Sequence, residues 1–435
     1  MQKTAKNIFP IILMLALSLA MLMPAYATNI PESETKAAAL KELGLFTGMS
    51  ESETNFDLDR APTRTEALVM LIRTLGKESE ALSGSWSHPF TDVASWADKY
   101  VGYGYEKKLT EGMSGTEFGT GNADSDMYLT FMLRALGYSE AAGDFTWDAP
   151  DALAQAVGIL PDNVDTTDFK RADIALVSWA ALETDLKDGG QRLAKKLMAE
   201  GTFTGDDYGR AIERVKASEP EPVSVSSAEA LKAALADKTT KAISIDSVGT
   251  PVIVAGELTV PKGVTVTVNR GNDFYIEGTL TNDGAINVMG ADSYTADFIN
   301  YSVMAVQNGG KIINNGRLGL CASAIGDEED RGPVGGQLRV FDGSFENKGS
   351  VYFQRGRVNT HGGVAFVDGG TFTNSATVVV DGFFIRIVNG GSFANSKGAV
   401  VINTATILVE EPGTFTNDGT LSGREPSGDS AAGQQ

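Results

Sequence analysis

The second half of the chain repeats a short pattern, Gly-x-apolar-x-Asn, and this repeat limits the possible folds more than any other feature. Its copies begin at Gly278, Gly310, Gly343, Gly370, Gly391 and Gly413. The last three copies lie about 21 residues apart, and the earlier ones are spaced more widely, as loop insertions would produce. β-Branched runs such as Val378–Val380 separate the copies. A period of strand, turn and inward apolar residue predicts stacked parallel coils, a β-solenoid.

Each position of this pattern has an expected role. The apolar positions, expected to face the core, are Leu280, Ile312, Phe345, Phe372, Phe393 and Phe415. The phenylalanines occupy equivalent positions, so we expect them to stack as an aromatic ladder. Glycine suits a tight corner and asparagine tolerates left-handed backbone, and stacked asparagines are also able to form a hydrogen-bonded ladder. An amphipathic stretch at 228–235 predicts a helix that covers the open end of the solenoid.

Composition changes near residue 220, which divides the chain into two units. Before it, Ala, Leu, Asp and Glu dominate and apolar residues recur at helical spacing; after it, Gly, Asn, Thr and Val dominate and alternate. The Pro/Glu stretch Ala217–Pro222 predicts a stiff, extended linker that keeps the units apart. The expected segments of this half are a linker at 217–225, a β-solenoid with an N-terminal capping helix at 226–423, and a disordered tail at 424–435.

The N-terminus has the pattern of an export signal. Lys3 and Lys6 precede an apolar run at 8–23, and Ala25-Tyr26-Ala27 matches a small-x-small cleavage site. The pattern predicts a secretory signal peptide at 1–27, with an uncleaved membrane anchor as the alternative. No later stretch is apolar for long enough to span a bilayer. We therefore expect a secreted chain without a transmembrane segment after cleavage.

Charge and metal-binding residues exclude several classes of function. The formal net charge of −20 would repel nucleic acid phosphates. With Cys321 as its single cysteine and only two histidines, the chain predicts no disulfide framework, metal site or other cofactor. Asp327–Asp330 is an acidic stretch that could bind calcium, but it lacks the alternation of a calcium loop, and a solvated loop is the favoured interpretation.

The first half contains three copies of one helical unit. In the first copy, Leu68, Leu71 and Ile72 form one apolar stripe of a helix expected over 63–75. The end of that helix, Ile72–Gly76, is echoed by Leu133–Gly137 in the second copy. The expected units are repeat 1 at 28–80, repeat 2 at 81–140, and repeat 3 at 141–216, which includes a closing helix near 191–200.

These repeats resemble the S-layer homology family. The likeness is carried by Phe90-Thr91-Asp92-Val93 with Trp96-Ala97, by Thr63-Arg64-Thr65-Glu66, and more loosely by Lys170-Arg171-Ala172-Asp173. The resemblance covers about residues 29–200. It implies an all-α, three-pronged repeat domain that binds secondary cell-wall polysaccharide, often with pyruvate-ketal sugars. The expected fold is thus multidomain, with this domain followed by an all-β, right-handed parallel β-helix.

The resemblance also implies which residues bind the polysaccharide. The family's signature arginine maps to Arg64 and Arg171, and Ser125 replaces it in the second repeat, which leaves binding there open. The other implied contacts are Glu66, Asp173, Asp92 and Trp96. Three of these have an alternative role: Glu66 forms a capping box with Thr63, Asp92 caps a helix, and Trp96 packs between helices.

Physical chemistry supports an anion near Arg64. The capping box places Arg64 in the first turn of a helix, where the helix dipole disfavours a cation unless an anion lies nearby. Free backbone N–H groups at the same end also favour anions, and a guanidinium binds a carboxylate through two hydrogen bonds. The alternative is a solvated Arg64, or one paired with Asp57 or Asp59.

The function expected from these features is that of a bacterial cell-surface protein. The repeats would anchor it non-covalently to wall polysaccharide, and the solenoid would have a structural or adhesive role, with its target left open. The alternatives are a wall-anchored polysaccharide lyase or hydrolase and a self-assembling S-layer subunit. Catalysis is not expected, because Asp368 and Asp381 lie near turns and Arg355, Arg357 and Arg386 are isolated.

Overall fold

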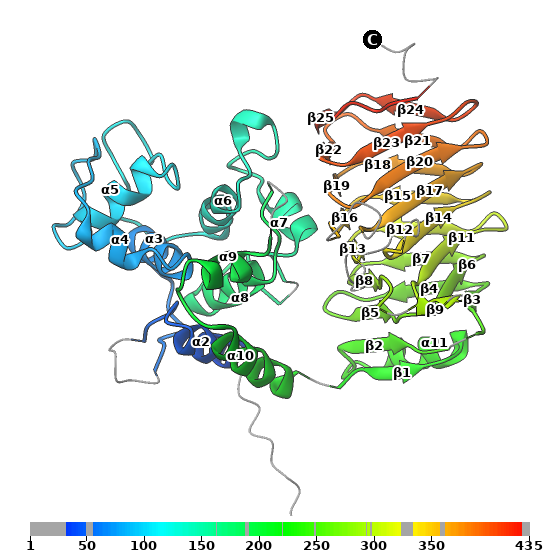
Figure 1. The fold of residues 1–435 in the computed structure, drawn as a ribbon, viewed down its shortest axis with the longest axis horizontal. Helices are drawn as coiled ribbons and strands as arrows, with labels where there is room; N and C mark the ends of the chain where they lie inside the picture. The colour runs from blue at the N-terminus through cyan, green and yellow to red at the C-terminus, as the bar shows by residue number, and fades with distance from the viewer. Residues whose placement is uncertain are drawn as a thin grey trace, which may run out of the picture.

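The protein consists of a helical N-terminal half and a stack of parallel strands (Figure 1). The computed structural model describes residues 32–48, 55–161, 163–187, 191–219, 221–247, 249–292, 294–295, 298–322, 334–356 and 362–428. The signal peptide predicted at 1–27, the acidic stretch Asp327–Asp330 and residues 429–435 of the predicted tail lie outside the described residues.

The helical half follows the apolar spacing of the sequence. Its helices are α2 (Glu32–Glu42), α3 (Arg64–Thr74), α4 (Glu78–Ser83), α5 (Asp98–Glu106), η1, a 3-10 helix (Glu140–Ala142), α6 (Ser125–Ala135), α7 (Asp151–Val157), α8 (Arg171–Leu182), α9 (Leu193–Ala199) and α10 (Gly205–Ser218). Helix α9 matches the expected closing helix, but α10 follows it and was not predicted. A capping box between Thr204 and Asp207 begins α10, a start signal that the sequence analysis overlooked.

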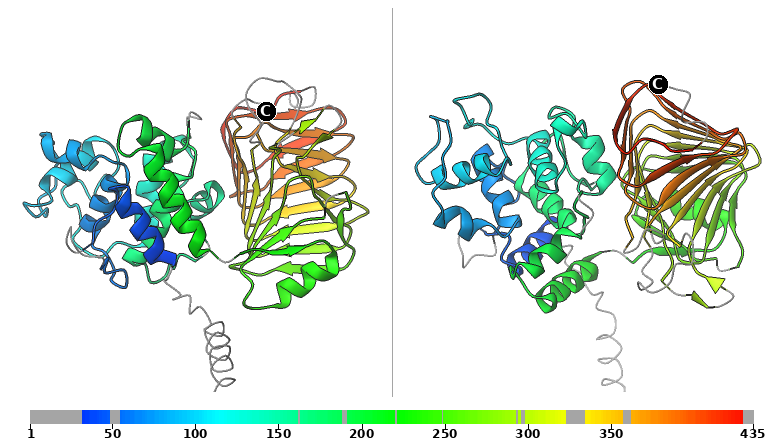
Figure 2. Two further views of the ribbon diagram at one scale, coloured as in Figure 1. Left: turned by 60° about the horizontal axis from the view of Figure 1, so that its bottom comes forward. Right: turned by 45° about the horizontal axis from the view of Figure 1, so that its top comes forward.

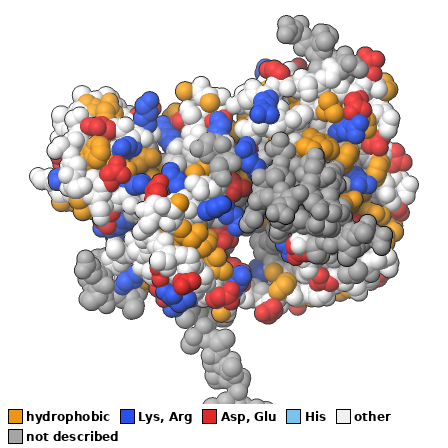
Figure 3. All heavy atoms as spheres, in the orientation of Figure 1, with side chains coloured by type: hydrophobic (Ala, Val, Ile, Leu, Met, Phe, Trp, Pro, Cys, Tyr) orange, Lys and Arg blue, Asp and Glu red, His pale blue; other side chains and the backbone are white. Residues whose placement is uncertain are grey.

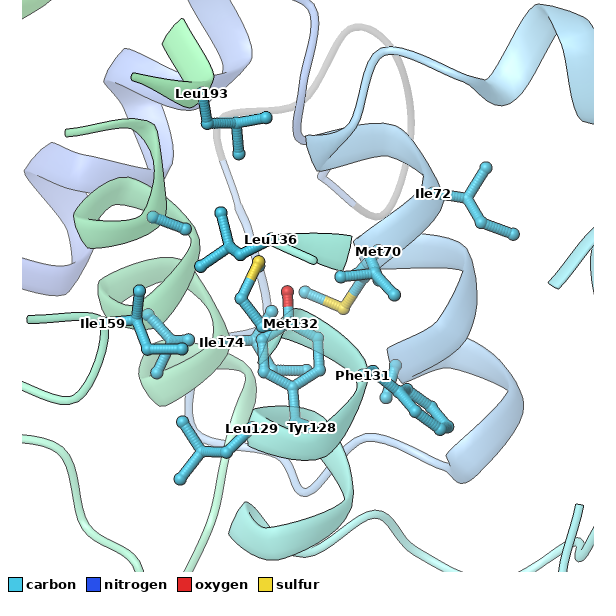
Figure 4. Close-up of a cluster of buried hydrophobic side chains, with 14 of the residues drawn as sticks. Met70, Ile72, Tyr128, Leu129, Phe131, Met132, Leu136, Ile159, Ile174 and Leu193 are labelled. Atoms are coloured by element: carbon cyan, nitrogen blue, oxygen red, sulfur yellow. The ribbon is translucent and has the colours of Figure 1, made fainter. Parts of the chain in front are cut away.

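Three helices of this half start at the positions that the repeat alignment equates. Helices α3, α6 and α8 begin at Arg64, Ser125 and Arg171, and each contacts the other two. Figure 4 shows buried side chains gathered at this centre, including Met132 and Tyr128. The predicted capping box at the start of α3 is confirmed, because Thr63 and Glu66 each accept a hydrogen bond from the other's backbone N–H.

The second half forms three parallel sheets around one core. The nine-stranded first sheet contains β1 (Val223–Val225), β2 (Ala242–Ile245), β5 (Thr265–Val268), β8 (Ala285–Val288), β13 (Arg317–Leu320), β16 (Ser350–Phe353), β19 (Thr377–Val380), β22 (Val400–Asn403) and β25 (Thr420–Gly423). The second sheet contains β3 (Val252–Val254), β6 (Asp273–Ile276), β11 (Val303–Val306), β14 (Gln337–Val340), β17 (Val364–Asp368), β20 (Phe384–Val388) and β23 (Thr406–Val409). The third sheet contains β4 (Glu257–Val260), β7 (Thr279–Asn282), β12 (Lys311–Asn314), β15 (Ser344–Asn347), β18 (Thr371–Asn374), β21 (Ser392–Asn395) and β24 (Thr414–Asn417).

This arrangement confirms a parallel β-helix. From β2 onward, successive strands of these sheets belong to the first, second and third sheets in turn, so each coil adds one strand to each sheet. The wider spacing of the early repeats comes from insertions between the first and second sheets, ahead of β11, β14 and β17. One insertion contains a short antiparallel pair, β9 (Tyr294–Thr295) and β10 (Phe298–Ile299).

The predicted phenylalanine ladder is present in the third sheet. Phe345, Phe372 and Phe393 are fully buried and in register, and their neighbouring ring centroids are 4.6 Å apart. Phe415 extends the stack at 5.3 Å and is partly buried in the last coil. The repeat therefore predicted both the inward face and the strand register correctly.

The asparagines of the pattern form the predicted ladder too. Asn347 Nδ2 donates to Asn374 Oδ1 at 2.8 Å and to the carbonyl of Thr377 at 3.0 Å, and neighbouring coils repeat this arrangement. These asparagines do not supply left-handed backbone, contrary to the other expected role. The pattern's glycines allow close approach: a Cβ on Gly370 would lie 2.0 Å from the carbonyl oxygen of Phe341.

The two ends of the solenoid differ. Helix α11 (Ala228–Ala236) contacts β1 to β4, and its Leu231 is fully buried, which confirms the predicted capping helix. At the other end, Ser427 forms a parallel bridge with Leu408. The disorder predicted for 424–435 is therefore wrong for the described residues 424–428, because Ser427 pairs with β23.

The two halves are docked together, which differs from the separation expected of the linker (Figure 2). Helix α7 packs against β13, β16 and β19, and the outward-facing Tyr352, Val379 and Ile402 belong to the helical core. The connection is also shorter than 217–225, because α10 ends at Ser218 and β1 begins at Val223. The physical reason for the docking lies in β16 and β19. Both strands are buried on their outer face as well as their inner face, because the helical half covers the outer one.

Candidate ligand-binding groove

A groove of about 330 Å³ lies where α3, α5 and α8 meet. We call it the arginine groove. Its polar and aromatic lining consists of Thr47, Arg60, Glu66, Arg73, Trp96, Tyr100 and Arg171. These residues come from all three of the predicted repeat segments, so the groove depends on how α5 and α8 pack against α3. It brings together three of the sequence-predicted site residues, namely Arg171, Glu66 and Trp96.

Arg171 provides a buried cation at the base of this groove. Its side chain starts from the first residue of α8, and the residue is 7% exposed. Nε donates to the carbonyl of Phe56 at 3.0 Å, and the guanidinium lies 5.7 Å from the Phe46 ring centroid. Among the described residues no carboxylate forms a salt bridge with it. Burial lowers the pKa of Arg171 from its usual 12.5, so its charge is only partly compensated.

Arg60 and Glu66 form a rigid ion pair on the groove wall. Arg60 Nη1 and Nη2 each donate to one oxygen of Glu66 at 2.9 Å, and Nε binds Asp57 at 2.7 Å. The hydrogen bonds from Arg60 lower the pKa of Glu66 to about 2. Glu66 is therefore a fixed carboxylate that positions Arg60, as well as the partner of Thr63 in the capping box.

Arg73 and two aromatic residues complete the opening of the groove. Arg73 Nε donates to Glu78 at 2.8 Å, and Tyr100 donates to the same Glu78 oxygen at 2.6 Å. Trp96 is 60% exposed, so the predicted packing of Trp96 between helices is wrong. An exposed indole beside guanidinium groups offers an apolar face together with charged donors.

Arg64 lies outside the arginine groove. Its guanidinium carbon is 5.2 Å from the ring centroid of Phe118 and 5.5 Å from that of Phe131, and its Nε is buried without a hydrogen-bond partner. Burial lowers the pKa of Arg64, while Asp124 and Asp92 act in the opposite direction. The alternative pairing with Asp57 or Asp59 does not occur. Arg64 and Arg171 are thus each the first residue of a helix, but only Arg171 lines the arginine groove.

The two aspartates that were predicted to contact the ligand accept hydrogen bonds from backbone N–H groups and do not line the arginine groove. Asp92 accepts hydrogen bonds from the N–H groups of Phe118 and Gly119, both at 2.8 Å. Asp173 accepts from the N–H groups of Asp165 and Lys170 at 2.9 and 2.8 Å. The backbone bond from Phe118 lowers the pKa of Asp92, whereas burial raises the pKa of Asp173.

The equivalent position of the second repeat holds no cation. Ser125 is the first residue of α6, is 3% exposed, and donates to the carbonyl of Thr166 at 3.2 Å. The residues that sequence analysis missed in the arginine groove are Arg60, Arg73 and Tyr100. The echo between Ile72–Gly76 and Leu133–Gly137 contained a signal for Arg73, because an arginine occupies the same position in both.

Three solenoid residues that the sequence analysis weighed for catalysis, Arg355, Arg386 and Asp368, have partners. Arg355 Nη2 lies 2.6 Å from Asp381, Arg386 Nε lies 2.7 Å from Glu410, and Asp368 accepts from Asn389 at 2.7 Å. Among the described residues, no group of three or more His, Cys, Asp or Glu side chains could hold a metal ion. In the same part of the chain, no helix is long and apolar enough to cross a membrane.

The fold thus combines a helical N-terminal region with a parallel β-helix docked against it. No protein-family model matches the chain, and no curated protein has a matching sequence.

Proposed function

We propose that this is an exported bacterial surface protein whose helical repeats bind an acidic secondary polysaccharide of the cell wall. The observation that carries the proposal is Arg171, a buried cation without a carboxylate partner among the described residues, beside the exposed Trp96. A carboxylate on a sugar would compensate that charge, and the indole would pack on the sugar ring.

The charges of the arginine groove support an anionic ligand. Arg60, Arg73 and Arg171 line it together with Glu66. Arg60 is paired with Asp57 and Glu66, and Arg73 with Glu78, so Arg171 is the cation of this lining that has no carboxylate partner among the described residues. Acidic residues outnumber basic ones in the whole chain, and Figure 3 shows both kinds of side chain interspersed on one face of the molecule. A pyruvate ketal, which carries one carboxylate on a sugar, has the charge and size that such a groove accepts.

The S-layer homology resemblance supports the same function. It equates Arg64 and Arg171 with the family's ligand-binding arginine, and both begin helices that pack at one centre. In this proposal the repeats form the three-pronged arrangement of that family and the signal peptide exports the chain. The solenoid is then displayed from the wall in a structural or adhesive role. We also propose that the β-helix is right-handed, the hand of nearly all parallel β crossovers.

The test is binding of wall polymer released from purified sacculi, measured by calorimetry. Arg171→Ala should weaken binding by roughly 1.5–3 kcal/mol, the value of a charge-assisted hydrogen bond. Arg64→Ala should weaken polymer binding to a similar extent, although Arg64 lies beside Phe118 and outside the arginine groove. The matched control is Ser125→Ala, which changes the equivalent position of α6 and should leave affinity almost unchanged. Equal losses in all three variants would contradict the placement of the ligand.

A further inference from the structure

A second hollow, of about 270 Å³, lies between the helical region and the solenoid. The helical side contributes the end of α7 and the C-terminal half of α8, and the solenoid side contributes β13 and β16. We call it the interdomain pocket. Ligand sites often lie where two domains meet, and this volume suits a single sugar-sized molecule.

Several polar groups of this pocket have no partner. Tyr352 is 6% exposed, and its hydroxyl has no hydrogen bond to any residue that the structure describes. Arg317 donates from Nη1 to Asn287 at 3.0 Å, but its Nε is buried without a partner. The Asp185 carboxylate likewise accepts no hydrogen bond within the described part of the chain. Arg317 Nε is thus a buried donor without an acceptor, which is unfavourable, and the Tyr352 hydroxyl and the Asp185 carboxylate beside it are free to bind a polar ligand.

The pocket uses repeat elements that elsewhere carry arginines. Ala180 occupies the position in α8 that Arg73 has in α3 and Arg134 has in α6. Helix α8 thus has no cation at this position. Arg317 of the solenoid lies close to the end of α7, since its Nη2 is 3.4 Å from where a Cβ on Gly158 would be. Ala180 and Arg317 line the same pocket, so the solenoid contributes a guanidinium to it.

We propose that the interdomain pocket binds an amino sugar, a hexose unit with a free ammonium group. Asp185, Glu183 and Glu219 line the helical side and favour a cation, while Lys36 on the same wall is paired with Glu32. The Asp185 carboxylate accepts from the ammonium group, and Arg317 and Tyr352 bind ring hydroxyls. This site goes beyond the proposed wall anchoring, because the arginine groove favours an anion and this pocket a cation.

Protonation states suit this assignment. Burial raises the pKa of Tyr352 well above 10, so its hydroxyl stays available as donor and acceptor. Burial also raises the pKa of Asp185 above its usual 3.8. An ammonium group beside Asp185 would counter that effect and lower the pKa again. Such a ligand would also join both domains, so its binding stabilises their docking.

The test titrates D-glucosamine, N-acetyl-D-glucosamine and D-glucose into the mature chain, with binding followed by NMR. D-Glucosamine should bind most tightly, and Asp185→Asn or Arg317→Gln should weaken it at least about tenfold. Tyr352→Phe, which keeps the ring and its packing, should weaken binding by a few fold. The matched control is Arg386→Gln on the outer face of the solenoid, which should bind as the parent does.

Three results would overturn the proposal: no D-glucosamine binding, equal binding of N-acetyl-D-glucosamine, or unchanged affinity in Asp185→Asn. A melting curve of each variant shows whether it is folded. If Arg317→Gln is unfolded, Tyr352→Phe still tests whether the pocket binds D-glucosamine. Wall-polymer binding is measured in parallel. It should be unchanged in Asp185→Asn, so failure of one site is distinguished from failure of the other.

Discussion

Phe372→Ala tests the architecture of the solenoid most sharply. Phe372 is fully buried and stacks between Phe345 and Phe393, each at 4.6 Å between ring centroids. Replacing a buried phenylalanine by alanine typically lowers the free energy of unfolding by about 3–5 kcal/mol. Loss of two stacking contacts, each worth about 0.5–1.5 kcal/mol, places the expected value in the upper half of that range.

The assay is urea unfolding followed by circular dichroism, together with limited proteolysis. Thr373→Ala is the matched control, because Thr373 is on the same strand but on its outer face, and a change within about 0.5 kcal/mol is expected. Since coils contact only their neighbours, proteolysis should open the C-terminal coils first. Polymer binding should survive, because the arginine groove lies wholly in the helical half. If Phe372→Ala were as stable as Thr373→Ala, the inward register would be wrong.

Three further predictions address the asparagine ladder, the groove wall and the docking of the halves. Asn374→Ala removes the hydrogen bond that Asn374 accepts from Asn347 and those that it donates to Asn395 and to the carbonyl of Val400, so urea unfolding should show a loss of about 1–3 kcal/mol; a loss below about 0.5 kcal/mol would contradict the ladder. Glu66→Gln removes a carboxyl whose pKa is lowered to about 2, so its stabilisation is complete above the usual pKa of 4.5 and lost as pH falls from there to about 2. The parent and Glu66→Gln should therefore differ at pH 7 and converge through that window; a constant difference would refute the ion pair. Val379→Asp places a charge in the docked interface and should increase the radius of gyration in small-angle X-ray scattering, whereas an unchanged radius would argue against the docking.

Much of the solenoid could be predicted because its pattern is periodic. Each Gly-x-apolar-x-Asn copy faces the same environment, so one interpretation of Phe372 applies to Phe345 and Phe393 as well. Docking of the helical half was not predicted, since linker composition says nothing about contacts between distant residues. The continuous apolar run Val378–Val380 was a local signal, because a strand buried on both faces needs a second covering layer.

Three residues that local patterns singled out, Arg171, Glu66 and Trp96, line the arginine groove. Arg171 was found from a local tetrapeptide at a helix start. Tyr100 was missed because it reaches the groove through the tertiary packing of α5 against α3, and Arg60 because its pairing with Glu66 depends on the loop before α3. Asp92 accepts hydrogen bonds from backbone N–H groups and does not line the groove, whereas Trp96 is exposed and lines it. Residue type and spacing do not determine which side of a loop faces solvent.

The central claim is non-covalent binding to a secondary wall polymer, and co-sedimentation with purified sacculi tests it most directly. The mature chain is mixed with intact sacculi and with sacculi from which the secondary polymer has been extracted, at equal peptidoglycan mass. The account predicts that the protein sediments with intact sacculi and stays in solution with extracted ones, and that raised salt weakens the binding. Equal sedimentation with both preparations, or none with intact sacculi, would contradict it.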